Sequence, residues 1–435
     1  MKTAAIACAA ALMVLATSGW CLAFHDGGVA ACDGCHTMHN SSGGQPQTGS
    51  GSGNRYLLMG SDPSSTCLLC HASSLAADGY RVATSPVPPQ GSPPLQLTPG
   101  GDFSYLQKSY SWVNSVTGLP ATSPGDAHGH NIIAGDFFYF QDSRYAVAPG
   151  GVYPSASLSC ISCHDPHGSY RLTSATAGTV EKPVPGARSN PIRSSGSYGA
   201  LPTATEAVGV YRMLGGIGYA PASFPNDPFV NDPPIAVSPV VYNRPESASP
   251  TRVAYGRGMS EWCENCHSGL QHASYPNATV GNHPDGNAAK LSQQAVDTYN
   301  AYIKTGDLTG TFSTAYNSLV PFEEGTTDLS ALAADTTATT GASLSDNVMC
   351  LTCHRAHASA WDSSTRWNAA KGAYLTVGGA YPGIDAAGTG ANGEYATGKT
   401  EAEYAKTMYD RPASAFATNQ WSLCNKCHEN DQYKQ

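Results

Sequence analysis

The pattern of apolar and polar residues predicts few regular elements in this chain. Residues 291–303 place apolar side chains at the spacing of one helix face, which predicts an amphipathic helix. Residues 400–408 and 413–423 are also predicted helices, and the second begins behind Pro412. These three segments are a small part of a 435-residue chain. The pattern therefore indicates a protein with little long secondary structure.

Two further stretches have local signals. The segment "NIIAGDFFYFQDSRYAVAPGGVYP", residues 131–154, predicts short strands that end at the turn formers 149–151. The segment "GGIGYA", residues 215–220, is loosely similar to a nucleotide-binding loop. It lacks the third glycine and a supporting strand–helix–strand pattern, so it is predicted to be a turn.

The first 23 residues have the layout of a secretory signal peptide. Lys2 is followed by an apolar run and then by small residues, which predicts cleavage before Phe24. The run is alanine-rich and short for a membrane anchor, and no later stretch approaches the length of a membrane span. Because no shift of composition marks a domain boundary, residues 24–435 are expected to form a single elongated, secreted unit.

Composition argues against an ordinary aliphatic core. Glycine (46) and proline (30) make up about 17% of the chain, against a usual sum of about 12%. Charged residues are only 13%. Loss of Lys2 with the signal takes the formal net charge from −9 to −10, which disfavours nucleic acid as a partner. Such a loop-rich chain needs something other than aliphatic side chains to hold it together.

The cysteines indicate what else could hold the chain together. Two of the 14 cysteines lie in the predicted signal, and the other twelve all lie in six C-x-x-C-H motifs. The motif cysteines are Cys32, Cys35, Cys67, Cys70, Cys160, Cys163, Cys263, Cys266, Cys350, Cys353, Cys424 and Cys427. The motif histidines are His36, His71, His164, His267, His354 and His428.

The spacing of these motifs is that of c-type haem attachment. Two cysteines on one helical turn can form thioethers with the two vinyl groups of a haem, and the next histidine then binds the iron. Disulfides would not require a histidine after every second cysteine, and zinc ribbons pair two C-x-x-C units closely, whereas these motifs lie tens of residues apart. Six covalently bound haem c groups are therefore predicted, and their apolar surface would form the core.

Histidine is abundant enough to bind each iron from both sides. Six irons need twelve histidines, and eight remain beyond the motifs: His25, His39, His128, His130, His167, His272, His283 and His357. Methionine could replace histidine at some irons but would raise their reduction potential. The supply of histidine makes that replacement unnecessary.

The spare histidines differ in how well they are placed. His39, His167 and His357 each follow a motif as C-x-x-C-H-x-x-H, too close to reach the far face of their own haem but able to reach an adjacent one. The alternative is that each is a solvated surface residue. Three more predicted ligands lie near turn formers or the new N-terminus, namely His25, His130 and His283. His128 and His272 rank lowest, because His128 adjoins His130 and His272 follows His267 by five residues.

In its motifs and in longer stretches around them, the chain resembles the OmcS-like family of hexahaem outer-surface cytochromes of metal-reducing bacteria. The likeness covers nearly all of residues 24–435 and includes "FHDGGVAACDGCHTMHNS", "GHNIIAGD", "CHDPHG", "RVAYGRGMSEWCENCH" and "CLTCHRAHAS". The resemblance implies a multihaem cytochrome c fold, mostly coil with short α-helices and few short strands around stacked haems. It also implies that subunits polymerise and that His39 binds the haem iron on His354 of the next subunit.

Three functions remain in competition at the sequence level. The first is extracellular electron transfer by a conductive filament of copies of this chain, which exchanges electrons with other multihaem cytochromes and with acceptors such as metal oxides. The second is a monomeric periplasmic electron shuttle. The third is a reductase of a small substrate such as nitrite, which needs an open iron and often has lysine in place of a motif histidine. All six motifs end in histidine, so the chain is predicted not to be an enzyme.

Overall fold

The computed structural model describes most of the chain. The described residues are 32–37, 41–42, 45–46, 56–75, 81–115, 117–182, 190–195, 200–238, 252–270, 283–335, 337–386 and 394–429. The predicted signal peptide and the candidate ligands His25, His39 and His272 lie outside these ranges.

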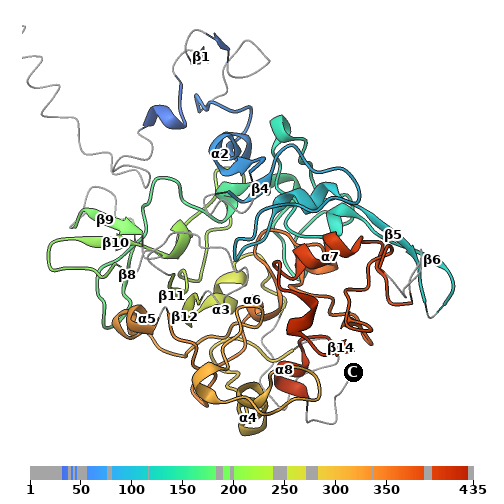
Figure 1. The fold of residues 1–435 in the computed structure, drawn as a ribbon. Helices are drawn as coiled ribbons and strands as arrows, with labels where there is room; N and C mark the ends of the chain where they lie inside the picture. The colour runs from blue at the N-terminus through green and yellow to red at the C-terminus, as the bar shows by residue number, and fades with distance from the viewer. Residues whose placement is uncertain are drawn as a thin grey trace, which may run out of the picture.

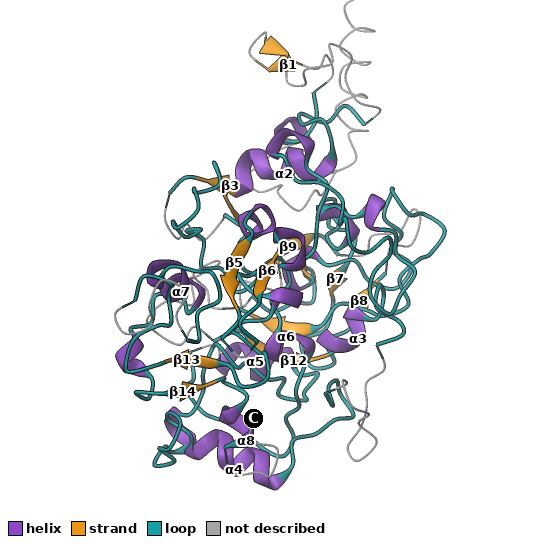
Figure 2. Ribbon diagram, turned by 90° about the vertical axis from the view of Figure 1, so that its right-hand side faces the viewer, coloured by secondary structure: helices purple, strands orange, loops and turns teal. Residues whose placement is uncertain are grey.

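Loops join many short elements, as Figure 2 shows. The α-helices are α2 Pro63–His71, α3 Met259–Cys263, α4 Gln293–Ala301, α5 Leu329–Asp335, α6 Cys350–Cys353, α7 Glu401–Thr407 and α8 Asn425–His428. Short 3₁₀ helices are η1 Cys32–Gly34, η2 Phe103–Gln107, η3 Gly125–Ala127, η4 Gly135–Phe137, η5 Ser155–Ser157, η6 Cys160–Ser162, η8 Tyr211–Met213, η9 Phe312–Thr314, η10 Asp362–Ser364 and η11 Ala413–Ala415. The predicted class, mostly coil with short helices and few strands, is confirmed.

The strands form small sheets only. They are β1 Ser41–Ser42, β2 Gln45–Pro46, β3 Ala72–Ser73, β4 Ala83–Thr84, β5 Tyr110–Val113, β6 Pro120–Ser123, β7 Arg171–Leu172, β8 Val180–Glu181, β9 Ile192–Ser195, β10 Ala207–Gly209, β11 Ile235–Val237, β12 Ala254–Arg257, β13 Tyr374–Thr376 and β14 Gln420–Trp421. Within the described chain, one sheet has four strands in the order β8-β7-β10-β9, and the others are pairs. Sheets of this size cannot form a core by themselves.

Two of the three predicted helices are confirmed. Helix α4 lies within 291–303 and is capped by the hydroxyl of Ser292. Helix α7 lies within 400–408 and begins with a capping box, in which Thr400 and Glu403 each accept a hydrogen bond from the other's backbone N–H. Local signals at the helix starts therefore agree with the final structure.

The predicted helix at 413–423 is wrong. Only the short η11 forms there, and the chain then extends into β14, which pairs with β13. Trp421 stacks on Tyr374 with ring centres 4.3 Å apart, and the Gln420 amide donates a hydrogen bond to the Thr305 hydroxyl at 2.9 Å. These tertiary contacts require an extended backbone and outweigh local helix propensity.

The strands expected within 131–154 are also absent as regular elements. The segment has η4 and isolated bridges, one of them between Ala134 and Tyr139. Phe138 adopts a left-handed conformation with φ of 60°, so the chain reverses within the apolar run and cannot extend. The stretch 215–220, predicted to be a turn, is a turn.

The motif-bearing helices are spread along the molecule. Helix α2 lies near one end, α3 and α6 lie in the middle, and α8 lies near the opposite end in both Figures 1 and 2. Apolar clusters pack around them, and the largest includes Trp367, Leu319 and Tyr404. No helix among the described residues is long and apolar enough to cross a membrane.

Candidate haem iron sites

All six motifs close the same hydrogen bond. In five of them the histidine N–H donates to the carbonyl of the first cysteine at 2.9–3.0 Å, and in the second motif both residues lie in α2. This is one turn of helix, which brings the two thiols and the imidazole to one side. None of the twelve motif cysteines is in a disulfide within the described part of the chain. Among the described residues, no group of three or more His, Cys, Asp or Glu side chains is arranged to hold a metal ion by itself.

Consecutive motifs are neighbours in space. Cys67 shares a hydrogen bond with Cys160, and Cys263 shares one with Cys350. The remaining consecutive motifs bring their thiols close enough for the charges to interact, in the pairs Cys35–Cys70, Cys163–Cys266 and Cys353–Cys424. The attachment points therefore follow one another through the molecule in sequence order.

Four motif histidines face a second imidazole from elsewhere in the chain. The pairs, with distances between ring centres, are His36–His167 at 6.4 Å, His164–His357 at 6.4 Å, His130–His267 at 6.0 Å and His283–His428 at 6.1 Å. A metal–imidazole bond of about 2.0 Å, with about 1.2 Å from the nitrogen to the ring centre, gives roughly 6.4 Å for two rings on one metal. The observed spacings therefore fit an iron between each pair. The other two motif histidines are His71 and His354.

The Nδ1 atoms of six candidate ligands are occupied by backbone carbonyls. The pairs are His36 with Tyr56 (2.9 Å), His130 with Ala356 (2.7 Å), His164 with Arg212 (2.6 Å), His267 with Pro149 (2.8 Å), His283 with Pro284 (2.7 Å) and His354 with Ser363 (2.7 Å). Because a carbonyl can only accept, each Nδ1 must carry the proton. That leaves the Nε2 lone pair available for a metal.

The surrounding protein lowers the pKa values of several candidate histidine ligands. His130 and His283 are exposed by surface area, yet burial lowers the pKa of both, that of His130 to about 4. Burial is the largest cause that lowers the pKa of His357 to about 3, followed by the neighbouring His164 and His130 and then by Arg212. Burial is likewise the largest cause of the lowered pKa of His164, to which the Arg212 charge again contributes. The lowered pKa values keep these imidazoles neutral, and a neutral imidazole is the form that binds metal.

The first, third and fifth motifs are held by an identical backbone arrangement, which we call the carbonyl hook. The hooks are residues 56–59, 212–215 and 363–366. In each, the first carbonyl accepts the Nδ1–H of the motif histidine, and the second accepts the N–H of the residue after that histidine, at 2.6–2.8 Å. The third residue forms a β-bridge with the histidine, and the fourth donates its N–H to the carbonyl of the second motif cysteine at 2.7–2.9 Å.

Each hook contains left-handed, non-glycine residues. Leu57 has φ of 56°, Arg212 and Met213 have φ of 51° and 57°, and Ser363 and Ser364 have φ of 57° and 56°. Such conformations are costly for these residue types and tend to occur at functional sites. Sequence reasoning missed the hooks because all of their contacts use backbone atoms, and the sequences YLLM, RMLG and SSTR share no residue pattern.

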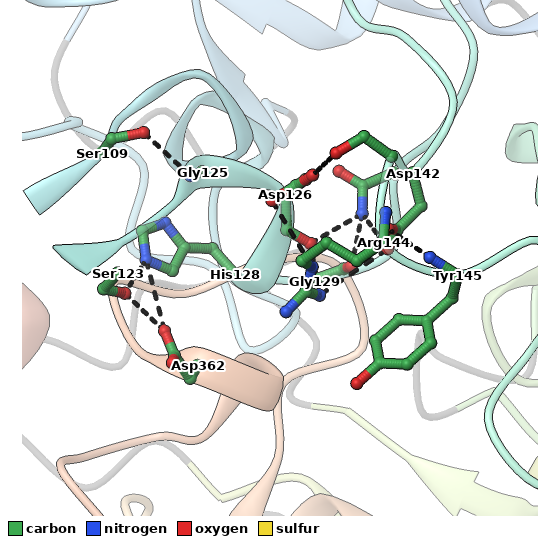
Figure 3. Close-up of polar contacts among 12 residues, drawn as sticks. Ser109, Ser123, Gly125, Asp126, His128, Gly129, Asp142, Arg144, Tyr145 and Asp362 are labelled. Atoms are coloured by element: carbon green, nitrogen blue, oxygen red, sulfur yellow. Dashed lines mark hydrogen bonds and ion pairs between the residues drawn. The ribbon is translucent and has the colours of Figure 1, made fainter.

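His128 faces none of the motif histidines. Figure 3 shows it beside Ser123 and Asp362. Its Nε2 lies 2.7 Å from the Ser123 hydroxyl and its Nδ1 lies 2.9 Å from the Tyr105 carbonyl, so both ring nitrogens are engaged. Burial lowers its pKa to about 4. Its carbonyl accepts the N–H of Ser359 at 3.0 Å, which fixes the segment of His130 beside that of His357.

Comparisons with known proteins place these features in context. No protein-family model matches the chain. C-type cytochrome OmcS of Geobacter sulfurreducens is 46% identical over 448 residues, which cover 99% of each sequence. Two solved structures, the cryo-EM structure of the OmcS nanowires and that of the Outer Membrane Cytochrome S filament, both from Geobacter sulfurreducens, match with a TM-score of 0.83. In both cases the identity is 46%, over 94% of this chain and 100% of the other.

Proposed function

The chain belongs to the OmcS family of C-type cytochromes, and from that membership we propose that it transfers electrons outside the cell through six covalently attached haems in filaments of its own subunits. The four imidazole pairs at 6.0–6.4 Å carry this proposal, because each brings a second histidine opposite a motif histidine and would hold an iron from both sides. When bound, haem supplies the one-electron chemistry, and the chain's residues orient and enclose it. The resemblance inferred from the motifs is confirmed by the family match.

A repeated unit supports the assignment of ligands. We define a unit as a loop histidine, then C-x-x-C-H-x-x-H, then C-x-x-C-H. The chain contains this order three times, with loop histidines His25, His130 and His283. The carbonyl hooks recur at the first motif of every unit. The chain is thus organised as three two-haem units.

The ligand pairs obey one rule in the second and third units. Each loop histidine faces the last motif histidine of its own unit, as in His130–His267 and His283–His428. Each C-x-x-C-H-x-x-H sends its final histidine back to the first motif of the preceding unit, as in His167–His36 and His357–His164. Every unit therefore completes one iron of its own and one iron of its predecessor.

Extending the rule to the first unit yields two further assignments. Its loop histidine, His25, becomes the second ligand on the iron of His71. Its final histidine, His39, must serve the first motif of a unit that precedes the first one, and such a unit exists only in another copy of the chain. That motif is the one of His354, at the start of the third unit. We propose that this shared ligand joins subunits head to tail, and that the contact produces an open filament.

The same ligand count argues against catalysis on a small substrate. A reductase needs an iron with an open position, whereas each of the four described imidazole pairs would hold its iron from both sides. All six motifs also retain histidine. We propose that the chain has no catalytic site and acts as an electron carrier.

The predicted signal peptide and the acidic balance support an extracellular location. We propose export through the periplasm to the outer surface, with other multihaem cytochromes and extracellular acceptors such as metal oxides as redox partners. Residues 24–435 are proposed to form one unit, since contacts join distant segments. The Gly91 N–H donates to the Glu403 carboxylate at 3.2 Å, and the Tyr409 hydroxyl donates to the Thr98 carbonyl at 2.6 Å.

Electron microscopy of the purified native protein tests the proposal. Filaments whose repeat contains six haems per subunit are expected. Separate particles with every iron low-spin would instead indicate a monomeric shuttle, because no ligand would then need to cross between subunits. Stoichiometric carbon monoxide binding in the reduced protein would favour a reductase.

A further inference from the structure

Two of the imidazole pairs have the same type of ligation in different surroundings. In His36–His167 and in His164–His357, the first histidine is held by a carbonyl hook and the second ends a C-x-x-C-H-x-x-H. Identical axial ligands give no reason for different reduction potentials. Differences must come from hydrogen bonding, burial and nearby charge.

The His357 imidazole has no hydrogen-bond acceptor on its Nδ1. That atom is inaccessible to solvent and has no partner among the described residues. A Cβ on Gly100 would lie 2.7 Å from it, and the Phe103 ring stacks 4.7 Å from the imidazole, so protein covers this edge. An acceptor on Nδ1 makes an imidazole a stronger donor to the metal, and His357 lacks this assistance.

A positive charge lies at the same place. The hook of the third motif begins with Arg212, whose carbonyl accepts the Nδ1–H of His164 at 2.6 Å. The equivalent residue at the first motif is the neutral Tyr56. The fifth-motif hook has Ser363 at this place and Arg366 at its end. The Arg212 side chain is half-buried beside the His164 site, and its guanidinium lies 5.4 Å from the centre of the Tyr211 ring. A nearby cation opposes the extra positive charge of ferric iron and so favours the ferrous state.

We propose that Arg212 raises the reduction potential of the haem held by His164 and His357 above that of the haem held by His36 and His167. This inference rests on the proposed haem ligation. It assigns an electron-retaining position near the middle of the six-haem series. The Arg212 side chain creates this position, and the Arg212 backbone carbonyl holds the proximal ligand His164.

A potentiometric titration of the purified holoprotein, followed by visible and electron paramagnetic resonance spectra, tests this inference. Arg212→Gln removes the charge and leaves the hook backbone intact. One of the six haems is expected to become harder to reduce by about tenfold in equilibrium constant, which is about 59 mV for one electron. Arg212→Lys keeps the charge and should retain most of the wild-type curve. Lys406→Gln, which removes a surface charge paired with Asp410, should leave it unchanged.

The outcomes separate this inference from the proposed function. Six haem additions by intact mass, with low-spin spectra, in Arg212→Gln show that the sites are intact whatever the potentials are. An unchanged titration in that variant, or the same shift in Lys406→Gln, would overturn the inference. If Arg212→Gln does not load six haems, His357→Ala decides. The His357→Ala variant loses the low-spin signal of the haem held by His164 and His357, which identifies that signal in the wild type. In the wild type this haem should be reduced at a higher potential than the haem held by His36 and His167. The opposite order of reduction would overturn the inference.

Discussion

Replacing Gly101 by alanine tests whether backbone spacing fixes a haem ligand. Gly101 forms a parallel bridge with Ala358, and the Gly100 carbonyl accepts the N–H of the adjacent His357 at 2.8 Å. A Cβ on Gly101 would lie 1.8 Å from the Ala358 carbonyl oxygen, whereas Cβ contacts under 3.0 Å essentially never occur in real proteins. The two segments must therefore separate by about 1.2 Å.

That displacement is large against a metal–imidazole bond of about 2.0 Å, so His357 should leave its iron. One haem in six is expected to become high-spin. Gly101 has φ of +96°, and a positive φ costs an alanine about 1–2 kcal/mol. The strained hydrogen bond at Gly100 costs about 1 kcal/mol more. The free energy of unfolding should therefore fall by about 2–3 kcal/mol.

Carbon monoxide binding to the reduced variant measures the open iron, and denaturant unfolding measures the stability. Gly306→Ala is the matched control, because Gly306 has φ of +80° and an added Cβ there meets no atom within 4 Å. The control should lose about 1–2 kcal/mol and bind no carbon monoxide. A Gly101→Ala protein with six low-spin haems, or gas binding by the control, would refute the reasoning.

Three other outcomes can be measured. The mature wild-type protein should show six haem additions by intact mass, no titratable thiol and no appreciable carbon monoxide binding; fewer additions or a free thiol contradict the site assignment. His39→Ala should load six haems but fail to polymerise and turn one iron per subunit, that of His354, high-spin. Normal filaments from this variant with all irons low-spin would mean that another residue is the shared ligand. Burial raises the pKa of Glu323 from its ordinary 4.5 to about 7. The folded state then binds more protons in that window, so unfolding free energy should fall as pH rises through it, by at most about 3 kcal/mol. Glu323→Gln should flatten this dependence in urea titrations at several pH values, and an unchanged slope would assign the dependence to other groups.

The attachment sites can be predicted from the sequence because their chemistry depends on residue types. Cysteine and histidine at fixed spacing leave few alternatives, and the helical signals at Ser292 and Thr400 are equally local. The helix expected at 413–423 fails for the opposite reason. Its outcome depends on Tyr374 and Thr305, which are distant in sequence, and no local pattern records those contacts.

The pairing of ligands lies between these extremes. The C-x-x-C-H-x-x-H pattern argues against ligation of the nearest haem but does not say which neighbouring haem His167 or His357 reaches. The answer required the fold, which brings His167 to His36 and His357 to His164. The carbonyl hooks were beyond prediction, since any residue at Arg212 or Ser363 presents the same backbone oxygen.

The backward-reaching histidines give the protein a mechanical property as well as an electronic one. In the proposed ligation, the second and third units would each be fastened to the preceding unit through an iron, since His167 and His357 belong to a later unit than the histidines they face. Pulling two units apart would therefore load a metal–ligand bond as well as loops and small sheets. With His39 acting in the same way between subunits, tensile force along a fibre would pass through the irons from one chain to the next. The junctions between subunits would then be as strong as the joints inside them.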